Sequence, residues 1–222
     1  MLYEIVKRLV VPVRRLVLRP VVEGLGNVPR TGPVIVASNH LSFVDSVVIP
    51  MVIPRRVTFL AKAEYFEGRG LKGRIVRTLF EALGAVPVPR GRQRAAMAAL
   101  EVALQVLAAG QAFGIYPEGT RSRDGRLYRG RTGVAWLALA SGAPVVPVAL
   151  IGTDRLYPIG RRLPRMHRVT LRFGTPLDFT RYAGQAGSGR VRRAVTDEIM
   201  QAIHGLSEQD YVDSYNEHAS AA

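Results

Sequence analysis

Apolar and polar positions follow two alternating patterns along the chain, which predict strands separated by helices. Short runs of consecutive apolar residues predict buried strands, and longer segments with a helical period predict the helices between them. This alternation is typical of an α/β layer fold, so we expect a single domain with a largely central β-sheet flanked by helices. The expected strands are 34–38, 57–61, 85–88, 112–116, 145–150 and 169–173, and the expected helices are 43–52, 71–83, 92–109, 133–141 and 190–206.

The first 22 residues mix apolar and basic side chains with a helical period. Wound into a helix, most apolar residues fall on one face and the basic residues, from Lys7 to Arg19, on the other. Such a basic amphipathic helix either lies in a membrane interface or packs on the domain with its arginines in solvent, and the segment alone leaves both open. We therefore divide the chain into an amphipathic helix, 1–22, and an α/β domain, 23–222, with an acidic helical C-terminal tail.

Composition and charge limit which catalytic groups and which binding partners the protein can have. The chain of 222 residues holds 31 Lys and Arg against 17 Asp and Glu, a formal net charge of +14. That excess favours an anionic partner, which is nucleic acid, an anionic membrane or a phosphorylated substrate. Because cysteine is absent, thiol nucleophiles and cysteine zinc sites are excluded. No apolar run reaches the roughly 18 uncharged residues of a transmembrane helix, and no His and carboxylate spacing is typical of a metal site.

His40 stands at a strand-to-helix junction, where α/β folds place their functional residues. It follows the apolar strand 34–38, and Asp45 comes five residues later in the first turn of the next helix. Asp45 could orient the imidazole and leave its other nitrogen free to take a proton from a hydroxyl. An alternative is structural: Ser42 and Asp45 also have the spacing of a capping box, which would make His40 an ordinary turn residue.

A second polar cluster, residues 116–122, directly follows the expected strand 112–116. Pro117 and Gly119 predict a tight turn with free backbone N–H groups. Arg121 supplies donors suited to a phosphate, and Glu118 could anchor that arginine or a substrate hydroxyl. A charged surface turn is the alternative. Two further cations, Lys62 and Arg90, follow the expected strands 57–61 and 85–88.

Together these motifs resemble the 1-acylglycerol-3-phosphate acyltransferase family, within the lysophospholipid and glycerolipid acyltransferase superfamily. The resemblance rests on Asn-His-Leu-Ser-Phe-Val-Asp at 39–45 and Tyr-Pro-Glu-Gly-Thr-Arg-Ser at 116–122, in that order, and it spans roughly residues 23–180. Residues 84–90 are similar to the second motif of the family and 145–149 to its proline-containing fourth. The resemblance implies no acyl-enzyme, which agrees with the absence of cysteine and of a G-x-S-x-G serine motif in the chain.

The resemblance implies transfer of an acyl group from acyl-CoA or acyl carrier protein to the free hydroxyl of a lysophospholipid, without a metal or prosthetic group. It makes His40 the general base and Asp45 its orienting partner. Acceptor phosphate would be held by Lys62, Arg90 and Arg121, in a pocket shaped by Glu118, Gly119 and Thr120. It also favours the membrane alternative for residues 1–22, with the protein peripheral on the cytoplasmic face of the cell membrane.

One departure from the family pattern puts the acceptor in question. Pro89 stands where the family usually has Asp or Asn before the arginine of the second motif. The first hypothesis is that lysophosphatidic acid is acylated to phosphatidic acid, and the second that another lysophospholipid or a lyso-aminolipid is the acceptor. A non-catalytic lipid-binding domain and a nucleic-acid-binding domain are hypotheses of other classes. Charge alone supports nucleic acid, and no RNA-binding or helix-turn-helix signature accompanies it, so we expect no nucleic-acid partner.

Overall fold

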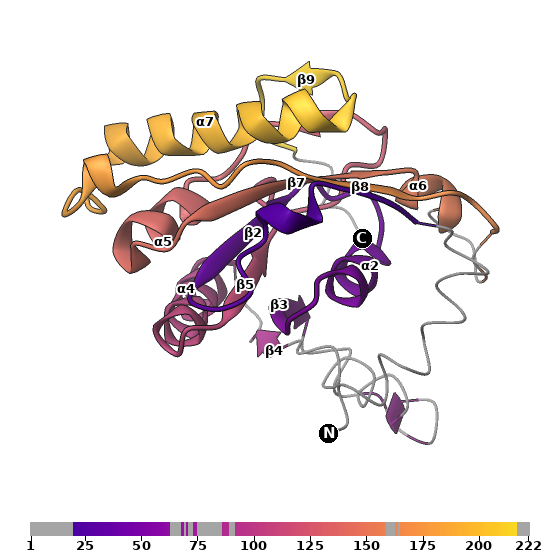
Figure 1. The fold of residues 1–222 in the computed structure, drawn as a ribbon, viewed down its shortest axis with the longest axis horizontal. Helices are drawn as coiled ribbons and strands as arrows, with labels where there is room; N and C mark the ends of the chain where they lie inside the picture. The colour runs from indigo at the N-terminus through magenta and orange to yellow at the C-terminus, as the bar shows by residue number, and fades with distance from the viewer. Residues whose placement is uncertain are drawn as a thin grey trace.

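A computed structural model of the protein describes residues 20–62, 68, 70, 73–74, 86–88, 92–158, 163 and 165–216, with the backbone alone at 61–62, 86–88 and 92–96. Helices flank a sheet in this structure (Figure 1). The α-helices are α2 (Asp45–Val52), α4 (Arg92–Ala108), α5 (Gly133–Ser141), α6 (Thr153–Leu156) and α7 (Gly189–Ser207), and short 3-10 turns lie at Leu25–Asn27 and Thr180–Tyr182.

Seven strands form the main sheet in the order β1-β8-β7-β2-β5-β3-β4. Neighbouring strands run parallel except β7 and β8, which pair antiparallel. A second, two-stranded sheet joins β6 to β9 in parallel. The strands are β1 (Val21–Glu23), β2 (Val34–Ser38), β3 (Val57–Lys62), β4 (Val86–Val88), β5 (Ala112–Ile115), β6 (Leu127–Tyr128), β7 (Val145–Ile151), β8 (Thr170–Phe173) and β9 (Tyr211–Val212).

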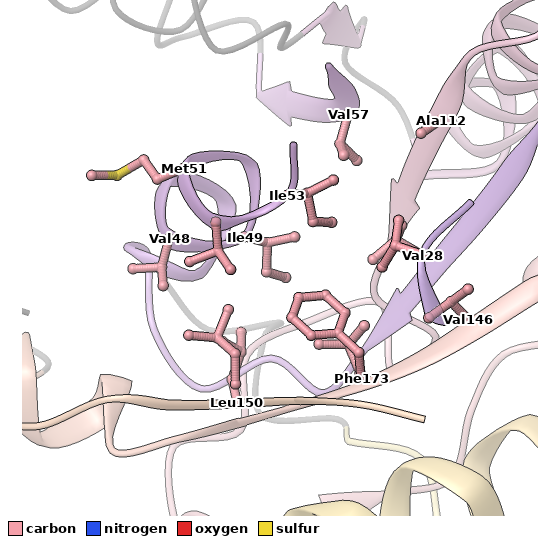
Figure 2. Close-up of a cluster of buried hydrophobic side chains, with 14 of the residues drawn as sticks. Val28, Val48, Ile49, Met51, Ile53, Val57, Ala112, Val146, Leu150 and Phe173 are labelled. Carbon is pink, nitrogen blue, oxygen red and sulfur yellow. The ribbon is translucent and has the colours of Figure 1, made fainter. Parts of the chain in front are cut away.

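The core lies on both faces of the sheet because alternate residues of its central strands point in opposite directions. Val34 and Val36 of β2 pack in a cluster beneath α2, whereas Ile35 and Ala37 pack on the other face, in a cluster with α4, α5 and α7. Figure 2 shows the first cluster, in which Ile49 and its neighbours on α2 face strand residues. Burial of β2 on both faces explains its unbroken apolar sequence.

The expected fold class is confirmed, and the expected strands correspond to β2, β3, β4, β5, β7 and β8. Helices expected at 43–52, 92–109, 133–141 and 190–206 correspond to α2, α4, α5 and α7. The expected helix 71–83 lies mostly outside the described residues, as does most of the expected helix 1–22. None of the helices within the described residues is both long and apolar enough to cross a membrane.

Two of the expected boundaries are wrong. The N-terminal helix cannot extend to residue 22, because Val21 and Val22 belong to β1 and pair with Thr170 and Leu171 of β8. These valines are β-branched and follow Pro20, which favours an extended chain. The C-terminal tail is helical only to Ser207, and the chain beyond it forms β9.

Candidate active site

Four parallel strands bring the predicted motifs to one edge of the sheet. β2, β5, β3 and β4 are consecutive neighbours, so their carboxyl ends point the same way. His40 follows β2, and the turn that contains Glu118 follows β5. Lys62 is the last residue of β3 and pairs with Val88 of β4. Loops that are far apart in the sequence therefore converge where α/β folds form their sites.

His40 and Asp45 form the dyad that their spacing predicts. His40 Nδ1 lies 2.8 Å from Asp45 Oδ2. The same carboxylate oxygen accepts hydrogen bonds from the backbone N–H groups of Leu41, at 2.7 Å, and Ser42, at 2.8 Å. Asp45 is fully buried, whereas the His40 side chain is 16% exposed. A carboxylate at Nδ1 places the proton there and leaves Nε2 as the acceptor.

The capping-box alternative describes part of the same geometry. Asp45 does reach back to the Ser42 N–H, as the last residue of a capping box would. The Ser42 hydroxyl, however, donates to the Tyr157 carbonyl at 3.1 Å instead of capping α2. Helix α2 has no side-chain cap at its amino end. Asp45 thus holds the loop backbone and His40 with one oxygen, and the two interpretations do not exclude each other.

The Tyr116 ring stacks on the His40 imidazole, a contact that the sequence pattern did not predict. The two rings stack with centroids 3.9 Å apart and an interplanar angle of 8°. The Tyr116 hydroxyl is fixed by a 2.9 Å hydrogen bond with Ser46 of α2. Burial, together with the Asp45 charge, raises the pKa of Tyr116 well above its usual value, so the phenol stays neutral. The sequence did place Tyr116 at the end of the strand that leads to Glu118, and residues that follow strand ends often contribute to functional sites.

Glu118 ties the two loops together through the backbone. One carboxylate oxygen accepts from the His40 N–H at 3.2 Å and the other from the Tyr128 N–H at 3.0 Å. Its carboxyl is buried. Burial raises its pKa to about 7 although both backbone bonds favour the ionised form, and the charges of Asp45 and Asp124 add to the rise. Glu118 therefore supports the His40 loop. The sequence left open whether it anchors Arg121 or a substrate hydroxyl, and both of these hydrogen bonds come from backbone N–H groups instead.

The turn after Glu118 has the shape that its sequence predicts. Gly119 has a φ of +75°, and its N–H donates to the Tyr116 carbonyl at 2.9 Å. This left-handed backbone conformation is the reason for glycine at this position. Thr120 is half-buried and Arg121 is exposed beside it. Ser122 N–H donates to the His40 carbonyl at 2.7 Å, which joins this turn directly to the dyad.

The remaining predicted cations are placed only in part. Lys62 lies at the same sheet edge by its backbone, and its side chain lies outside the described part of the structure. Arg90 lies outside the described residues, two positions after β4 ends. Arg131 is a further cation beside the turn that the sequence pattern did not single out: its side chain is exposed, and its backbone N–H donates to the Pro117 carbonyl at 2.8 Å. Within the described residues, no three His, Asp or Glu side chains gather as a metal site.

The arrangement of these residues suits proton transfer from a hydroxyl group. An accessible imidazole with an oriented, buried carboxylate can accept a proton from a hydroxyl. The adjacent turn carries Arg121, and Arg131, whose N–H donates to the Pro117 carbonyl, lies beside it; both arginines are exposed. An imidazole base with cations beside it suits a hydroxyl substrate that carries negative charge.

Comparison with known proteins agrees with this class. The sequence model of the family described as Acyltransferase matches residues 19–151. A chloroplastic 1-acyl-sn-glycerol-3-phosphate acyltransferase of Arabidopsis thaliana is 32% identical over 140 residues, 63% of this chain and 38% of that protein. A 1-acyl-sn-glycerol-3-phosphate acyltransferase of Bacillus subtilis is 26% identical over 182 residues, 81% of this chain and 84% of that protein. The crystal structure of the 1-acyl-sn-glycerophosphate (LPA) acyltransferase PlsC of Thermotoga maritima superposes with a TM-score of 0.64 at 30% identity, and covers 84% of this chain and 70% of that one.

The chain therefore belongs to the acyltransferase family, as its two motifs predicted. It spans less than two fifths of the length of the chloroplastic relatives that it matches. The matched residues contain His40, Asp45 and the whole Glu118–Arg121 turn, and they end at residue 151. Everything after β7 lies beyond the family match.

Proposed function

We propose that the protein is an acyltransferase that moves a fatty acyl group from acyl-CoA or acyl carrier protein to the free hydroxyl of lysophosphatidic acid, giving phosphatidic acid. The observation that carries this proposal is the hydrogen-bonded pair of His40 and Asp45, joined by Ser122 and Glu118 to the arginine-bearing turn. The acceptor named here is the one in the names of the similar proteins.

In the proposed reaction His40 acts as a general base on the acceptor hydroxyl. Nε2 takes the hydroxyl proton as the oxygen attacks the thioester carbonyl, and the Asp45 carboxylate stabilises the imidazolium that forms. The tetrahedral intermediate collapses by breaking its carbon–sulfur bond, and the imidazolium returns the proton to the thiolate that leaves. The proton balance closes on the protein without a covalent enzyme intermediate, and no metal or prosthetic group takes part in the proposal.

Acceptor phosphate is assigned to the cations that surround the sheet edge. We place it against Arg121 and propose Lys62 and Arg90 as its further ligands. Gly119 and Thr120 shape the floor of this pocket. Glu118 contributes indirectly, by accepting the hydrogen bond from the His40 backbone N–H. The base and the cations come from different loops. In the proposal, binding of the phosphate by the cations therefore positions the acceptor hydroxyl at Nε2.

The enzyme also has to reach a lipid substrate, and we propose that it works peripherally on an anionic membrane surface at the cytoplasmic face of the cell membrane. The residues before β1, 1–20 of the predicted 1–22, remain the proposed anchor. A second contact is supported by Leu163 and Met166, which are 77% and 70% exposed beside the exposed Arg165 and Arg168. Apolar side chains interspersed with arginines suit an anionic interface. The loop they occupy starts near Tyr157, which accepts the Ser42 hydrogen bond.

Vesicle sedimentation tests the membrane proposal. Wild-type protein is expected to sediment with phosphatidylglycerol vesicles and less with phosphatidylcholine vesicles. Met166→Asp is expected to weaken binding more than tenfold, because burial of an apolar side chain of this size contributes about 1.5–3 kcal/mol. Met97→Asp is the matched control, since Met97 is 53% exposed on α4. Equal losses in the two variants would contradict the proposed contact.

An acceptor and donor panel tests the reaction itself. Oleoyl-CoA and oleoyl-acyl carrier protein are each offered with lysophosphatidic acid, other lysophospholipids and a lyso-aminolipid, and the products are identified by mass spectrometry. Preferred formation of phosphatidic acid supports the proposal. Preferred acylation of another acceptor would support the second candidate, which Pro89 motivates. Vesicle binding without any turnover would favour a non-catalytic lipid-binding domain.

A further inference from the structure

The chain after α7, residues 208–216, returns to the active site although it lies beyond the family match. Helix α7 ends at Ser207, and Glu208 has a left-handed conformation with a φ of +61°. After this reversal the chain forms β9, which pairs with β6 in the two-stranded sheet. In Figure 1 β9 is the yellow strand above one end of α7. We call residues 208–216 the C-terminal segment.

Gln209 bridges the two loops of the site. Its side-chain oxygen accepts a 2.6 Å hydrogen bond from Asn39 Nδ2, and its nitrogen donates to the Gly125 carbonyl at 2.7 Å. Asn39 directly precedes His40 and is fully buried. The Asn39 amide also exchanges hydrogen bonds with the Leu150 N–H and carbonyl of β7, at 2.8 and 2.9 Å. With the Leu150 carbonyl and Gln209 as acceptors, both donor hydrogens of the Asn39 amide are used.

The rest of the C-terminal segment holds the chain that follows the arginine-bearing turn. Leu127 N–H donates to the Asp210 carbonyl at 2.9 Å, and Arg129 N–H donates to the Val212 carbonyl at 3.1 Å. Asn216 Nδ2 donates to the carbonyl of Arg121 itself at 3.2 Å. These bonds fix the backbone on either side of Tyr128, whose N–H holds Glu118. The segment thus reaches the His40 loop and the Arg121 turn at the same time.

We propose that the C-terminal segment is a positioning element of the active site, and that Gln209 is the positioning residue that fixes the His40 loop relative to the Arg121 turn. The kinetic consequences of this inference rest on the proposed function. The base comes from one loop and a phosphate ligand from the other, so their separation decides whether the acceptor hydroxyl meets Nε2. Because small misplacements of reacting groups reduce rates strongly, an uncoupled pair of loops would lower turnover and weaken acceptor binding together.

Kinetics of Gln209→Ala test this inference, with Gln201→Ala as the control from an exposed position on α7. We expect kcat/KM for the acceptor to fall about tenfold through a lower kcat and a higher KM, since two hydrogen bonds of ordinary net strength correspond to about an order of magnitude. Assays run well below the thermal midpoint of the variant, where a merely destabilised protein keeps its kcat and KM. Kinetic constants equal to those of wild type would overturn the inference.

Amide hydrogen exchange provides a readout that does not depend on activity. In Gln209→Ala we expect faster exchange in peptides that cover 38–46 and 118–129, and unchanged exchange in the centre of α7. Exchange that accelerates equally in α7 would show general destabilisation and overturn the inference. If wild-type protein acylates no acceptor, the proposed function fails, whereas unchanged exchange at 38–46 in the variant would refute the positioning role alone.

Discussion

Substitution of Asp45 by Asn separates the charge of the dyad from its shape. The amide oxygen can still accept from the Leu41 and Ser42 N–H groups, so the loop backbone keeps its anchor. The amide nitrogen takes the place of Oδ1, which is buried and makes no hydrogen bond. A donor without an acceptor at that point costs about 1–3 kcal/mol of folding free energy, which lowers the thermal midpoint without unfolding the protein at the assay temperature.

The loss of catalysis is expected to be much larger than the loss of stability. His40 Nδ1 and Asp45 Oδ2 are 2.8 Å apart, and the carboxylate is fully buried. Unit charges about 4 Å apart attract by about 4 kcal/mol at an effective dielectric constant of about 20, and this attraction stabilises the imidazolium in the transition state. Its removal corresponds to roughly a thousandfold in rate, within the range of about a hundred- to ten-thousandfold for general-base catalysis.

Thiol release from oleoyl-CoA in the presence of lysophosphatidic acid measures this effect. We expect kcat of Asp45→Asn to fall about a thousandfold with little change in KM for the acceptor. Asp154→Asn, at a half-buried aspartate of α6, is the control and is expected to keep wild-type kinetics. Circular dichroism verifies that both variants are folded at the assay temperature. If Asp45→Asn retained more than a tenth of wild-type kcat, the carboxylate charge would have no major catalytic role.

Three further predictions concern the groups around the dyad. Gly114→Ala places a methyl group against the Phe59 ring, so we expect a loss of about 1–3 kcal/mol in urea unfolding, and an unchanged midpoint would contradict this packing. Tyr116→Phe keeps the ring beneath His40 and is expected to retain most of kcat/KM, whereas Tyr116→Ala loses at least tenfold; equal activities would remove the role of the stack. Glu118 stays protonated in the folded protein while it ionises in the unfolded chain, so wild-type unfolding free energy should fall by about 3 kcal/mol as pH rises from 4.5 to about 7. Glu118→Gln is expected to lack that fall in urea titrations across this pH range, and an identical slope in both proteins would refute the raised pKa.

Much of the fold could be predicted because its central strands are buried on both faces. A strand such as β2 has to be apolar throughout, and its sequence shows that directly. The direction of β8 could not be predicted, because a parallel and an antiparallel partner leave the same apolar pattern in a short strand. β1, β6 and β9 have only two or three residues each, too few for a period to appear.

The dyad could be predicted because its two members are five residues apart at one strand-to-helix junction. The role of Glu118 could not, because its partners are backbone N–H groups that leave no mark on the sequence, one of them at a separation of 78 residues. Gln209 could not be predicted either, because its side chain meets that of Asn39 across 170 residues. Local spacing therefore predicted the dyad, and long-range contacts decide how it is held.

The central claim is that His40 is the base for acyl transfer to a lysophospholipid, and one measurement tests it most directly. Radiolabelled oleoyl transfer from oleoyl-CoA to lysophosphatidic acid is compared in wild-type protein, His40→Ala and His204→Ala, the last at an exposed histidine of α7. The account predicts labelled phosphatidic acid from wild type and His204→Ala, and at least a hundredfold less from His40→Ala. Equal rates in wild type and His40→Ala would contradict it.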